Sequence, residues 1–546
     1  MKVLNYFLLS LVFSAGCQKH DQDKRQSDCL YINFGREPTT HDGRKSTEIT
    51  TAFLYDLLSE GLMKMDPDGN IIPAQAERME ISDDGLTYTF YLKDTLWSNG
   101  EPVTAQDFAT SWLSCLNPQF PSPFAYHLYA IKNAEEAKAG EVPLDQVGIE
   151  VVDPKCLRVY LDQPNSTFLT LICSTFARPI RYKTDDESNA KNLLCNGPFY
   201  IEQWKEDAKH NLKKKNDKRI FLKRNPFYAN KDHFSFSAID ISLIENQNTS
   251  YELFRNGQLD FIGGSYSPVS PTSLETLPED QILESLASIS VAACNFNTTR
   301  FPLNNLHLRR ALSAAIDREL LATSLKAQKL SPAYSIVPNG FKTKHYDSFS
   351  PKSTEQAIAY FEEALKELAL TRETFPQLTL IYPSSNHNVL ITHIVQIMQQ
   401  SWHQVLGIEV ELQTYDLKTL VARLGKKDYD LGLVNWDANY PHPISFLERF
   451  LTKANPKNYS GWENPAFQTA IDHAYRSLNA SEQLECIMRA EEILADAIPV
   501  MPVVFTDCVM LMDKRISGLK ILKTGSFWVE SLKIHSPEKK SSGEQL

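Results

Sequence analysis

Short runs of β-branched or aromatic residues alternate with amphipathic helical stretches between Gln377 and Asn439, and no other feature constrains the fold as strongly. Apolar residues at every second position are typical of a strand, whereas apolar residues three and four positions apart lie on one face of a helix. Successive strand, helix, strand units imply parallel strands with right-handed crossovers, so this segment predicts an α/β fold. The predicted strands are 378–382, 408–413 and 429–436, and the predicted helices are 388–406 and 416–424.

Two loops of this segment are candidate binding loops. Ligands of parallel sheets bind beyond the carboxyl ends of the strands. Residues 383–388 follow the first predicted strand, and residues 437–443 follow the third. We therefore expect side chains that contact a ligand in both loops.

A second informative stretch is Trp97–Phe108, with the sequence WSNGEPVTAQDF. The dipeptide Asn99-Gly100 predicts a turn because both residues tolerate positive φ. Thr104 is placed to cap the following helix, and Asp107 is placed three residues later as the acidic partner of a capping box. Good folding does not require a tryptophan beside this turn, and we expect Trp97 to be exposed.

Length and charge limit the class of protein. A chain of 546 residues is too long for one core, so we expect two or three lobes. The net charge of -11 argues against a nucleic-acid-binding surface, and we expect no nucleic-acid partner. The chain contains no C-x-x-C, H-E-x-x-H or G-x-S-x-G motif. We therefore expect no metal site, no cofactor and no enzymatic activity.

The N-terminal residues predict export. The apolar run 3–13 is too short to span a bilayer and ends in Ser14-Ala15-Gly16-Cys17. Small residues directly before a cysteine resemble a lipobox, in which Cys17 becomes the acylated first residue of the mature protein. The alternative is a plain cleaved signal. We predict a signal peptide with a lipobox at 1–17, a polar tether at 18–28, and a protein on the periplasmic or extracytoplasmic face of the membrane, held there by a lipid anchor.

The remaining eight cysteines leave two alternatives open. An oxidising compartment permits disulfides, but their pairing does not follow from the sequence. The alternative is that most of these cysteines are buried free thiols.

The stretch Trp97–Phe108 resembles the signature of the oligopeptide-binding proteins of ABC transporters, the peptide- and nickel-binding family 5 of extracytoplasmic solute-binding proteins. Other stretches resemble landmarks of that family, in the same order. They are REPTT at 36–40, DLLSEGL at 56–62, NGPFY at 196–200, NGQLD at 256–260 and LRRALSAAIDR at 308–318.

The resemblance implies an α/β, two-lobed periplasmic-binding-protein fold of type II, in the large cluster with an extra domain. Mixed sheets flanked by helices would form a ligand cleft at a hinge. The implied division is lobe I at 29–59, 195–292 and 514–546, an inserted domain II at 60–194, and lobe III at 293–513.

The function implied by the resemblance is that of a monomeric receptor, which binds oligopeptides between its lobes and delivers them to an ABC permease in the membrane. In these receptors an extended peptide is held mainly through its backbone, and hydrated pockets accept varied side chains. One alternative is a receptor for peptidoglycan-derived peptides with the same cleft. The alternatives from other classes are a secreted peptidase and an adhesin-like surface lipoprotein.

The segment 436–440 departs from the family pattern at the position that would hold the charge of the ligand. The family has a tryptophan and, three residues later, an aspartate that binds the α-ammonium of the peptide, whereas this chain has Trp436 and Asn439. An amide cannot neutralise a cation, and hydrogen bonds to charged groups stabilise by about 1.5 to 3 kcal/mol, compared with about 1 kcal/mol for neutral ones. Asp437 would share a face with Asn439 in an extended backbone and is a candidate replacement. The alternatives are that Asp437 only caps the loop, or that the ligand lacks an ammonium there.

The resemblance also implies further candidate residues. Trp97 would line the peptide site, and His387 and Arg423 lie near positions from which relatives bind ligand carboxylates. For His387 the alternative is a solvated loop residue, and for Arg423 a residue that stabilises the helix end. The predicted ligand-binding residues are Trp97, His387, Arg423, Trp436, Asp437, Asn439 and Tyr440.

The segment 209–219 is rich in lysine and lies where relatives have a shorter hairpin. A solvated loop is expected there. The alternative is a surface patch for an anionic partner, whose effect high salt would abolish.

Overall fold

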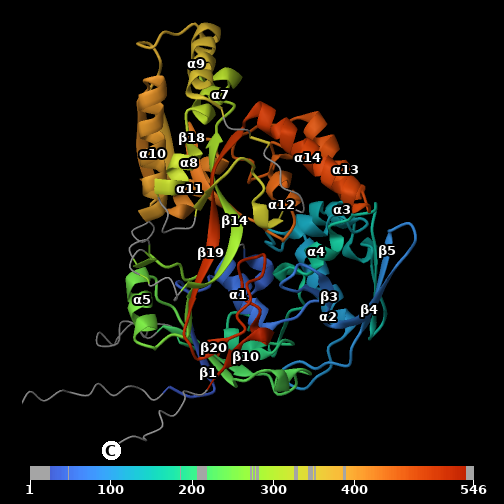
Figure 1. Cartoon of the computed structure of the whole chain (residues 1–546). Coiled ribbons are helices and arrows are strands. Elements are labelled where there is room, and N and C mark those ends of the chain that lie inside the picture. The colour runs from blue at the N-terminus through green and yellow to red at the C-terminus, as the bar shows by residue number, and fades with distance from the viewer. Residues whose placement is uncertain are drawn as a thin grey trace, which may run out of the picture.

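The computed structural model describes residues 25–535 with the exception of 47, 185, 206–217, 271–272, 275–276, 278–281, 325–329, 342–347, 350–351 and 385–388. Within these residues, one mixed eleven-stranded sheet extends through the molecule, and a separate four-stranded sheet lies beside it. Figure 1 shows an upper lobe, a lower lobe and a side domain around two long central strands.

The two central strands, β14 (Ile282–Phe296) and β19 (Val500–Met512), are antiparallel partners that contribute to both lobes. β18 pairs with the upper half of β14, and β13 pairs with the lower end of β19. The lobes are therefore connected by paired strands. The sheet order is β10 (Phe199–Lys205), β11 (Arg219–Arg224), β12 (Ala238–Ser242), β1 (Cys29–Asn33), β13 (Phe261–Gly263), β19, β14, β18 (Leu431–Asp437), β16 (Leu378–Pro383) and β17 (Val410–Tyr415), and β15 (Leu330–Pro332) pairs with β19.

The upper lobe confirms the parallel strands predicted between 377 and 439. β16 pairs in parallel with both β17 and β18, and α10 (Val389–Leu406) and α11 (Leu417–Gly425) form the crossovers. The Asp416 carboxylate accepts a hydrogen bond from the backbone of Thr419 and caps α11, as predicted. The second predicted strand begins two residues later than expected, at Val410.

Helices cover both faces of the upper sheet because successive strand residues point to opposite faces. Ala292 and Cys294 of β14 belong to one core cluster, whereas Val291 and Ala293 belong to the other. Figure 1 shows α7 to α10 on one side of the central strands and α12 to α14 on the other. The helices besides α10 and α11 are α7 (Leu306–Ala314), α8 (Arg318–Ser324), α9 (Thr354–Leu368), α12 (Ile444–Leu447), α13 (Pro465–Arg476) and α14 (Ala480–Ala497).

The lower lobe contains α1 (Ile49–Leu58), α5 (Gln247–Arg255) and the C-terminal strands β20 (Ile516–Ser517) and β21 (Lys533–Ile534). The buried Asp260 carboxylate lies 2.5 Å from the Arg515 guanidinium and 2.9 Å from that of Arg25. Buried ion pairs of this kind need close geometry to offset desolvation. Asp260 therefore fixes both terminal segments to this lobe.

The side domain has its own core, which contains the fully buried Trp112. It confirms the predicted turn and capped helix: the carboxylate of Asp107 accepts from the backbone N–H of Thr104 at 2.7 Å and from its hydroxyl at 2.9 Å. The elements are β2 (Met63–Met65), β3 (Ile71–Pro73), the sheet β4 (Ala76–Ile81), β5 (Thr87–Leu92), β7 (Cys156–Tyr160) and β6 (Ile149–Asp153), then β8 (Arg181–Tyr182), β9 (Leu193–Leu194), α2 (Ala105–Leu116), α3 (Ala134–Ala139) and α4 (Phe168–Ile172).

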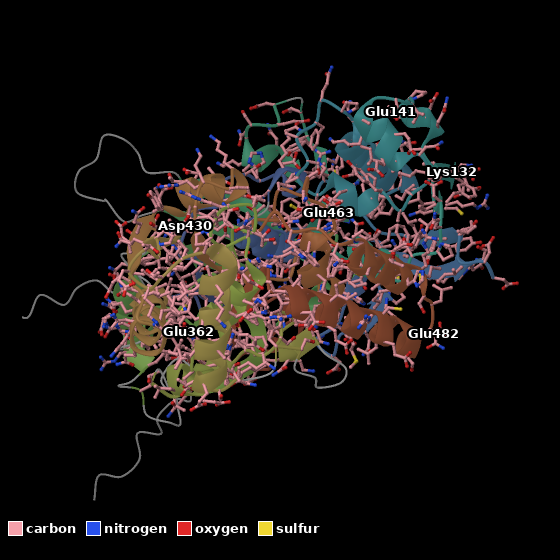
Figure 2. The ribbon with its side chains drawn as sticks, turned by 90° about the horizontal axis from the view of Figure 1, so that it is seen from above. Lys132, Glu141, Glu362, Asp430, Glu463 and Glu482 are labelled. Carbon is pink, nitrogen blue, oxygen red and sulfur yellow. The ribbon has the colours of Figure 1, made fainter. Side chains whose placement is uncertain are left out.

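Charged side chains cover the outside of this arrangement. Figure 2 shows Lys132 and Glu141 on the side domain, Glu362 on α9 and Glu482 on α14, and all four are exposed. None of the helices in the described ranges is both long and apolar enough to cross a membrane.

The eight cysteines after Cys17 are free thiols, six of them buried. Burial raises the pKa of the Cys195 thiol to about 12, so this thiol stays protonated and unreactive. The structure therefore agrees with buried free thiols for most of them. Cys17 lies outside the described residues, as do the lysines of the basic segment up to 217, which connects β10 to β11.

Candidate functional site

A cavity of about 410 Å³ lies where the upper lobe, the lower lobe and the side domain meet. This volume is within the usual range for small-molecule sites. Its walls come from α1, from the side domain, from the end of β18 with the loop that follows, and from the C-terminal segment 522–530. The candidate loop 437–443 therefore contributes to a cavity at the carboxyl end of a parallel strand, as the sequence predicts.

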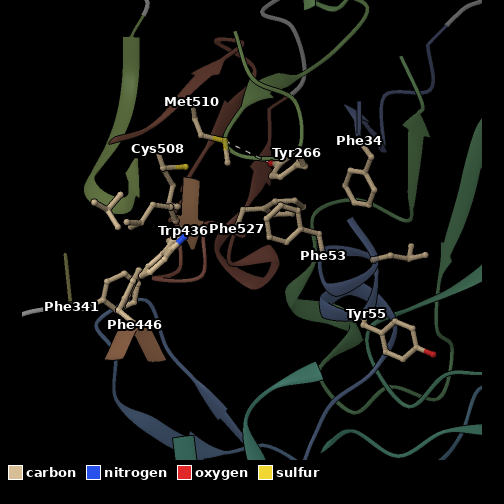
Figure 3. Close-up of a cluster of buried hydrophobic side chains, with 14 of the residues drawn as sticks. Phe34, Phe53, Tyr55, Tyr266, Phe341, Trp436, Phe446, Cys508, Met510 and Phe527 are labelled. Carbon is tan, nitrogen blue, oxygen red and sulfur yellow. Dashed lines mark hydrogen bonds between the residues drawn. The ribbon is translucent and has the colours of Figure 1, made fainter. Parts of the chain in front are cut away.

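Trp436 forms part of the upper wall. Strand alternation places it on the face of β18 that joins the core shared with the lower lobe, and its side chain is only 2% exposed. The Arg449 guanidinium lies 4.7 Å from the Trp436 ring centroid, within cation–π range. Figure 3 shows Trp436 near Cys508, Phe446 and Phe527. The indole N–H of Trp436 has no hydrogen-bond acceptor among the described residues.

Asn439 lines the cavity, but a cation of the protein occupies its acceptor. The Lys457 ammonium donates to the Asn439 side-chain oxygen at 2.8 Å, and the Asn439 backbone N–H donates to the Ser445 hydroxyl at 2.8 Å. The side-chain N–H₂ of Asn439 is buried and has no partner among the described residues. No sequence pattern links Lys457 to Asn439, because eighteen residues separate them.

Two cations stand at this end of the cavity, Lys457 and Arg449. No carboxylate of the described chain lies within 4 Å of either cation, and Arg449 donates to the backbone carbonyls of Asp437 and Ser445. Burial, reinforced by Arg449, lowers the pKa of Lys457 to about 8. Burial also lowers the pKa of Arg449. The site therefore holds positive charge that the described chain does not neutralise by direct pairing.

Asp437 also lines the cavity, and its side chain is exposed. Its carboxylate accepts a hydrogen bond from the hydroxyl of Ser290, the residue opposite it on β14. Asp437 and Asn439 thus have different partners, although both reach the cavity. Whether Asp437 replaces the missing acid stays a prediction.

Tyr440 lies behind the cavity instead of lining it. It is fully buried and donates from its hydroxyl to the Glu448 carboxylate at 2.7 Å, and Tyr475 donates to the same oxygen at 2.8 Å. His127 of the side domain lies 3.7 Å from the other Glu448 oxygen, and its ring meets that of Tyr440 edge-on at 5.3 Å. The Tyr440 ring therefore faces the side domain and its hydroxyl faces Glu448, and a contact of Tyr440 with the ligand stays a prediction.

The expectation that Trp97 is exposed is wrong. Its side chain is fully buried in the core of the side domain, its indole N–H lies 3.4 Å from the Asp107 carboxylate, and it does not line the cavity. A tight turn with a flanking tryptophan looks the same in sequence whether the ring points into the core or out of it.

Of the remaining two candidates, the structure describes only Arg423. The Arg423 guanidinium pairs with Asp428 at 3.1 Å, contacts the Tyr415 hydroxyl and does not line the cavity. This agrees with a structural role at the end of α11. His387 lies outside the described residues.

On the lower side of the cavity, the lining cations Arg178 and Lys64 are ion-paired. The Arg178 guanidinium lies 2.5 Å from Asp56, and the Lys64 ammonium lies 2.6 Å from Glu530 and 3.1 Å from Glu60. These pairs connect the side domain to the lower lobe. Among the described residues, no group of three or more His, Cys, Asp or Glu side chains is arranged to hold a metal ion.

Comparison with known proteins matches the chain to bacterial solute-binding proteins. The model of the bacterial extracellular solute-binding proteins, family 5, middle region, matches residues 70–458. The oligopeptide-binding protein OppA of Bacillus subtilis is 31% identical over 519 residues, covering 93% of each chain. The probable deoxycholate-binding periplasmic protein YgiS of Escherichia coli is 28% identical over 500 residues, 90% of each chain. The structure of the Escherichia coli murein tripeptide binding protein MppA superposes with a TM-score of 0.79 at 24% identity, over 93% of this chain and 98% of the other.

Proposed function

The chain belongs to family 5 of the bacterial extracellular solute-binding proteins, and we propose that it is a receptor that captures oligopeptides between its lobes and delivers them to an ABC transporter. Its fold is the two-lobed α/β fold of the type II periplasmic binding proteins with an extra domain, as the sequence predicts. Family membership identifies a solute-binding receptor. The cavity must supply the argument for peptides.

The observation that carries the proposal is an unpaired strand edge at the cavity. In the described chain β16 pairs with β18 only at Leu431 and Gly432, whereas β14 pairs with β18 as far as Asp437. Beyond Gly432 the second edge of β18 therefore has no strand partner among the described residues. An extended peptide can add to such an edge through backbone hydrogen bonds, which do not depend on its sequence. Residues 434–439 on this edge line the cavity.

Binding and closure would be linked through the central strands. Because β14 and β19 connect the lobes, a ligand that contacts both would favour the closed arrangement in proportion to its higher affinity for it. We further propose lobe boundaries near residues 60, 195, 293 and 513, a monomeric receptor without catalytic activity, and an extracytoplasmic location with an anchor at Cys17.

Mass spectrometry of retained ligands tests the proposal. Protein purified without added ligand should release short peptides on denaturation, because a buried interlobe ligand dissociates slowly. Release of steroids or sugars alone, with no peptide, would refute the peptide proposal. Incubation with peptides should leave them intact, and their cleavage would favour the secreted peptidase.

A receptor for peptidoglycan-derived peptides is a second candidate. Asn439 favours it, because an amide at this position does not require an ordinary peptide ammonium. The retained ligands distinguish the two candidates directly, since cell-wall peptides contain D-residues and diamino acids.

A further inference from the structure

We propose that the end of the cavity at Asn439 binds a carboxylate of the ligand, with Lys457 and Arg449 as the recognising cations. This inference rests on the proposed function, because it specifies the chemistry of one end of the bound peptide. It differs from the expectation that Asp437 restores ammonium binding. The two alternatives predict opposite preferences for the charge of the ligand.

A ligand ammonium at Asn439 would meet a cation of the protein already bound to the side-chain oxygen. The side-chain oxygen of Asn439 already accepts from Lys457 at 2.8 Å. The amide orientation follows from this contact, because the opposite orientation would place the N–H₂ group against an ammonium. An incoming ammonium would have to displace Lys457 or approach it with like charge in a buried site, where screening by water is weak.

The cavity wall also holds buried donors that have no acceptor among the residues the structure describes. The Trp436 indole N–H and the Asn439 side-chain N–H₂ are buried without a partner among the described residues. Within the described part of the chain, Arg449 donates only to the backbone carbonyls of Ser445 and Asp437. Buried donors without acceptors cost stability, so groups of this kind mark a place for a bound acceptor. A carboxylate offers two oxygens and the charge that the two cations lack.

The neighbouring acids do not fill this role. Asp437 is the acidic residue of β18, and its carboxylate accepts a hydrogen bond from the hydroxyl of Ser290 on β14. Glu448 is the acidic group beneath the loop, and its carboxylate accepts from Tyr440 and Tyr475 and faces His127 of the side domain. Neither acid reaches within 4 Å of Lys457 or Arg449 in the described structure, although both are near enough to act on the pKa of Lys457.

An aromatic side chain of the side domain completes the subsite. The Lys457 ammonium lies 5.5 Å from the centroid of the Phe124 ring, and both residues line the cavity. A cation–π contact at this distance stabilises the charged lysine without neutralising it. Lys457 therefore lies between the upper lobe and the side domain, where Asn439 contacts it from one side and Phe124 from the other. A bound carboxylate would contact the ammonium at this position.

Calorimetric titration with three tripeptides tests the inference. The probes are trialanine with a free amino terminus, its N-acetyl form and its N-succinyl form, which differ in charge at one end. The protein is first freed of retained ligand by dialysis in mild denaturant. We expect the N-succinyl peptide to bind roughly 10- to 100-fold more tightly than the free-amine peptide, as one charge-assisted hydrogen bond would give.

The variant Lys457→Met keeps the apolar stem of the side chain and removes the cation. It should weaken binding of the N-succinyl peptide by roughly 10- to 100-fold and change binding of the N-acetyl peptide less than about threefold. Lys453→Met is the matched control, because Lys453 is exposed in the same loop and does not line the cavity. The double variant Asn439→Asp, Lys457→Met should reverse the preference and favour the free amine. Thermal unfolding of each variant shows that it is folded.

The outcomes separate the inference from the proposed function. If the free-amine peptide binds most tightly and Lys457→Met leaves the order unchanged, the carboxylate subsite is refuted while the peptide receptor stands. If Lys457→Met weakens all three peptides equally, the lysine acts only on the structure and the inference is also refuted. If none of the three binds the folded wild-type protein and no peptide is retained on purification, the proposed function itself fails.

Discussion

Replacement of Glu448 by glutamine tests how the loop behind the cavity is held. One oxygen of the buried Glu448 carboxylate accepts from Tyr440 at 2.7 Å and from Tyr475 at 2.8 Å. Each hydrogen bond to a charged group is worth about 1.5 to 3 kcal/mol, and a neutral one about 1 kcal/mol. Loss of the charge at two bonds therefore costs about 1 to 4 kcal/mol, and relief of desolvation reduces this cost. We expect Glu448→Gln to lower the free energy of unfolding by about 2 kcal/mol at pH 7.

The pH dependence of this effect has a definite sign. Burial alone would raise the pKa of Glu448, but the nearby His127 imidazole, together with hydrogen bonds from the hydroxyls of Tyr440 and Tyr475, lowers it below the ordinary value. A group with a lowered pKa in the folded state stabilises above its unfolded pKa, about 4.3, and loses this contribution as pH falls through the folded pKa. The difference between wild type and Glu448→Gln should therefore be constant from pH 7 to about 5 and shrink below about 4.

Differential scanning calorimetry measures both quantities. A loss of 2 kcal/mol corresponds to a fall in Tm of about 4 to 8 °C for a unit of 150–250 residues, the size expected of the upper lobe. Glu485→Gln on α14 is the matched control, because Glu485 is exposed and its replacement should leave Tm within about 1 °C. An unchanged Tm for Glu448→Gln, or a loss that is the same at pH 7 and pH 3, would refute the argument.

Three further predictions follow from the site and the core. The affinity of the wild-type protein for N-succinyl trialanine should fall about tenfold per pH unit above pH 8, because binding requires the charged Lys457 and raises its pKa. The affinity for the N-acetyl peptide should not change with pH, and equal pH profiles of the two peptides in calorimetric titration would contradict the prediction. Trp97→Ala should lower the free energy of unfolding in urea by about 3 to 5 kcal/mol and leave the peptide affinity of the folded protein within about twofold, whereas Trp436→Phe should weaken peptide binding. A selective loss of peptide affinity in Trp97→Ala would instead place Trp97 at the ligand. Gly197→Ala should cost about 1 to 3 kcal/mol by the same measurement, because its Cβ would lie 2.7 Å from the backbone of Leu58, and wild-type stability would show that this contact yields.

Local sequence patterns were sufficient for the parallel strands and the helix caps. The alternation of apolar residues sets which strand residues face each core, and Asp416 and Asp107 cap their helices with their own side chains. Such features depend on neighbours along the chain, so the sequence contains them. The family resemblance, which the comparisons confirm, extended this to the two-lobed fold.

The site was predicted only in part. Trp436, Asp437 and Asn439 line the cavity because they end a parallel strand, and this position follows from topology. Tyr440 and Arg423 found partners within the protein, in Glu448 and Asp428. Residues that are neighbours in sequence therefore differ in position: some line the cavity and others are buried, because different groups pack against them.

Two assignments depended entirely on tertiary packing. The Trp97 side chain turns into the core of the side domain because burying a large ring there is favourable, and a turn sequence carries no sign of that direction. Lys457 reaches Asn439 from a loop eighteen residues away, so no local pattern connects them.

The sequence by itself determined the strands and caps, the family and the position of Asn439 in place of the family's aspartate. Only the tertiary structure decided what that substitution means, because the charge of a binding site is set by all the groups that meet there in space. Asn439 alone indicates a weakened ammonium site, whereas Asn439 beside Lys457 and Arg449 forms a cationic one.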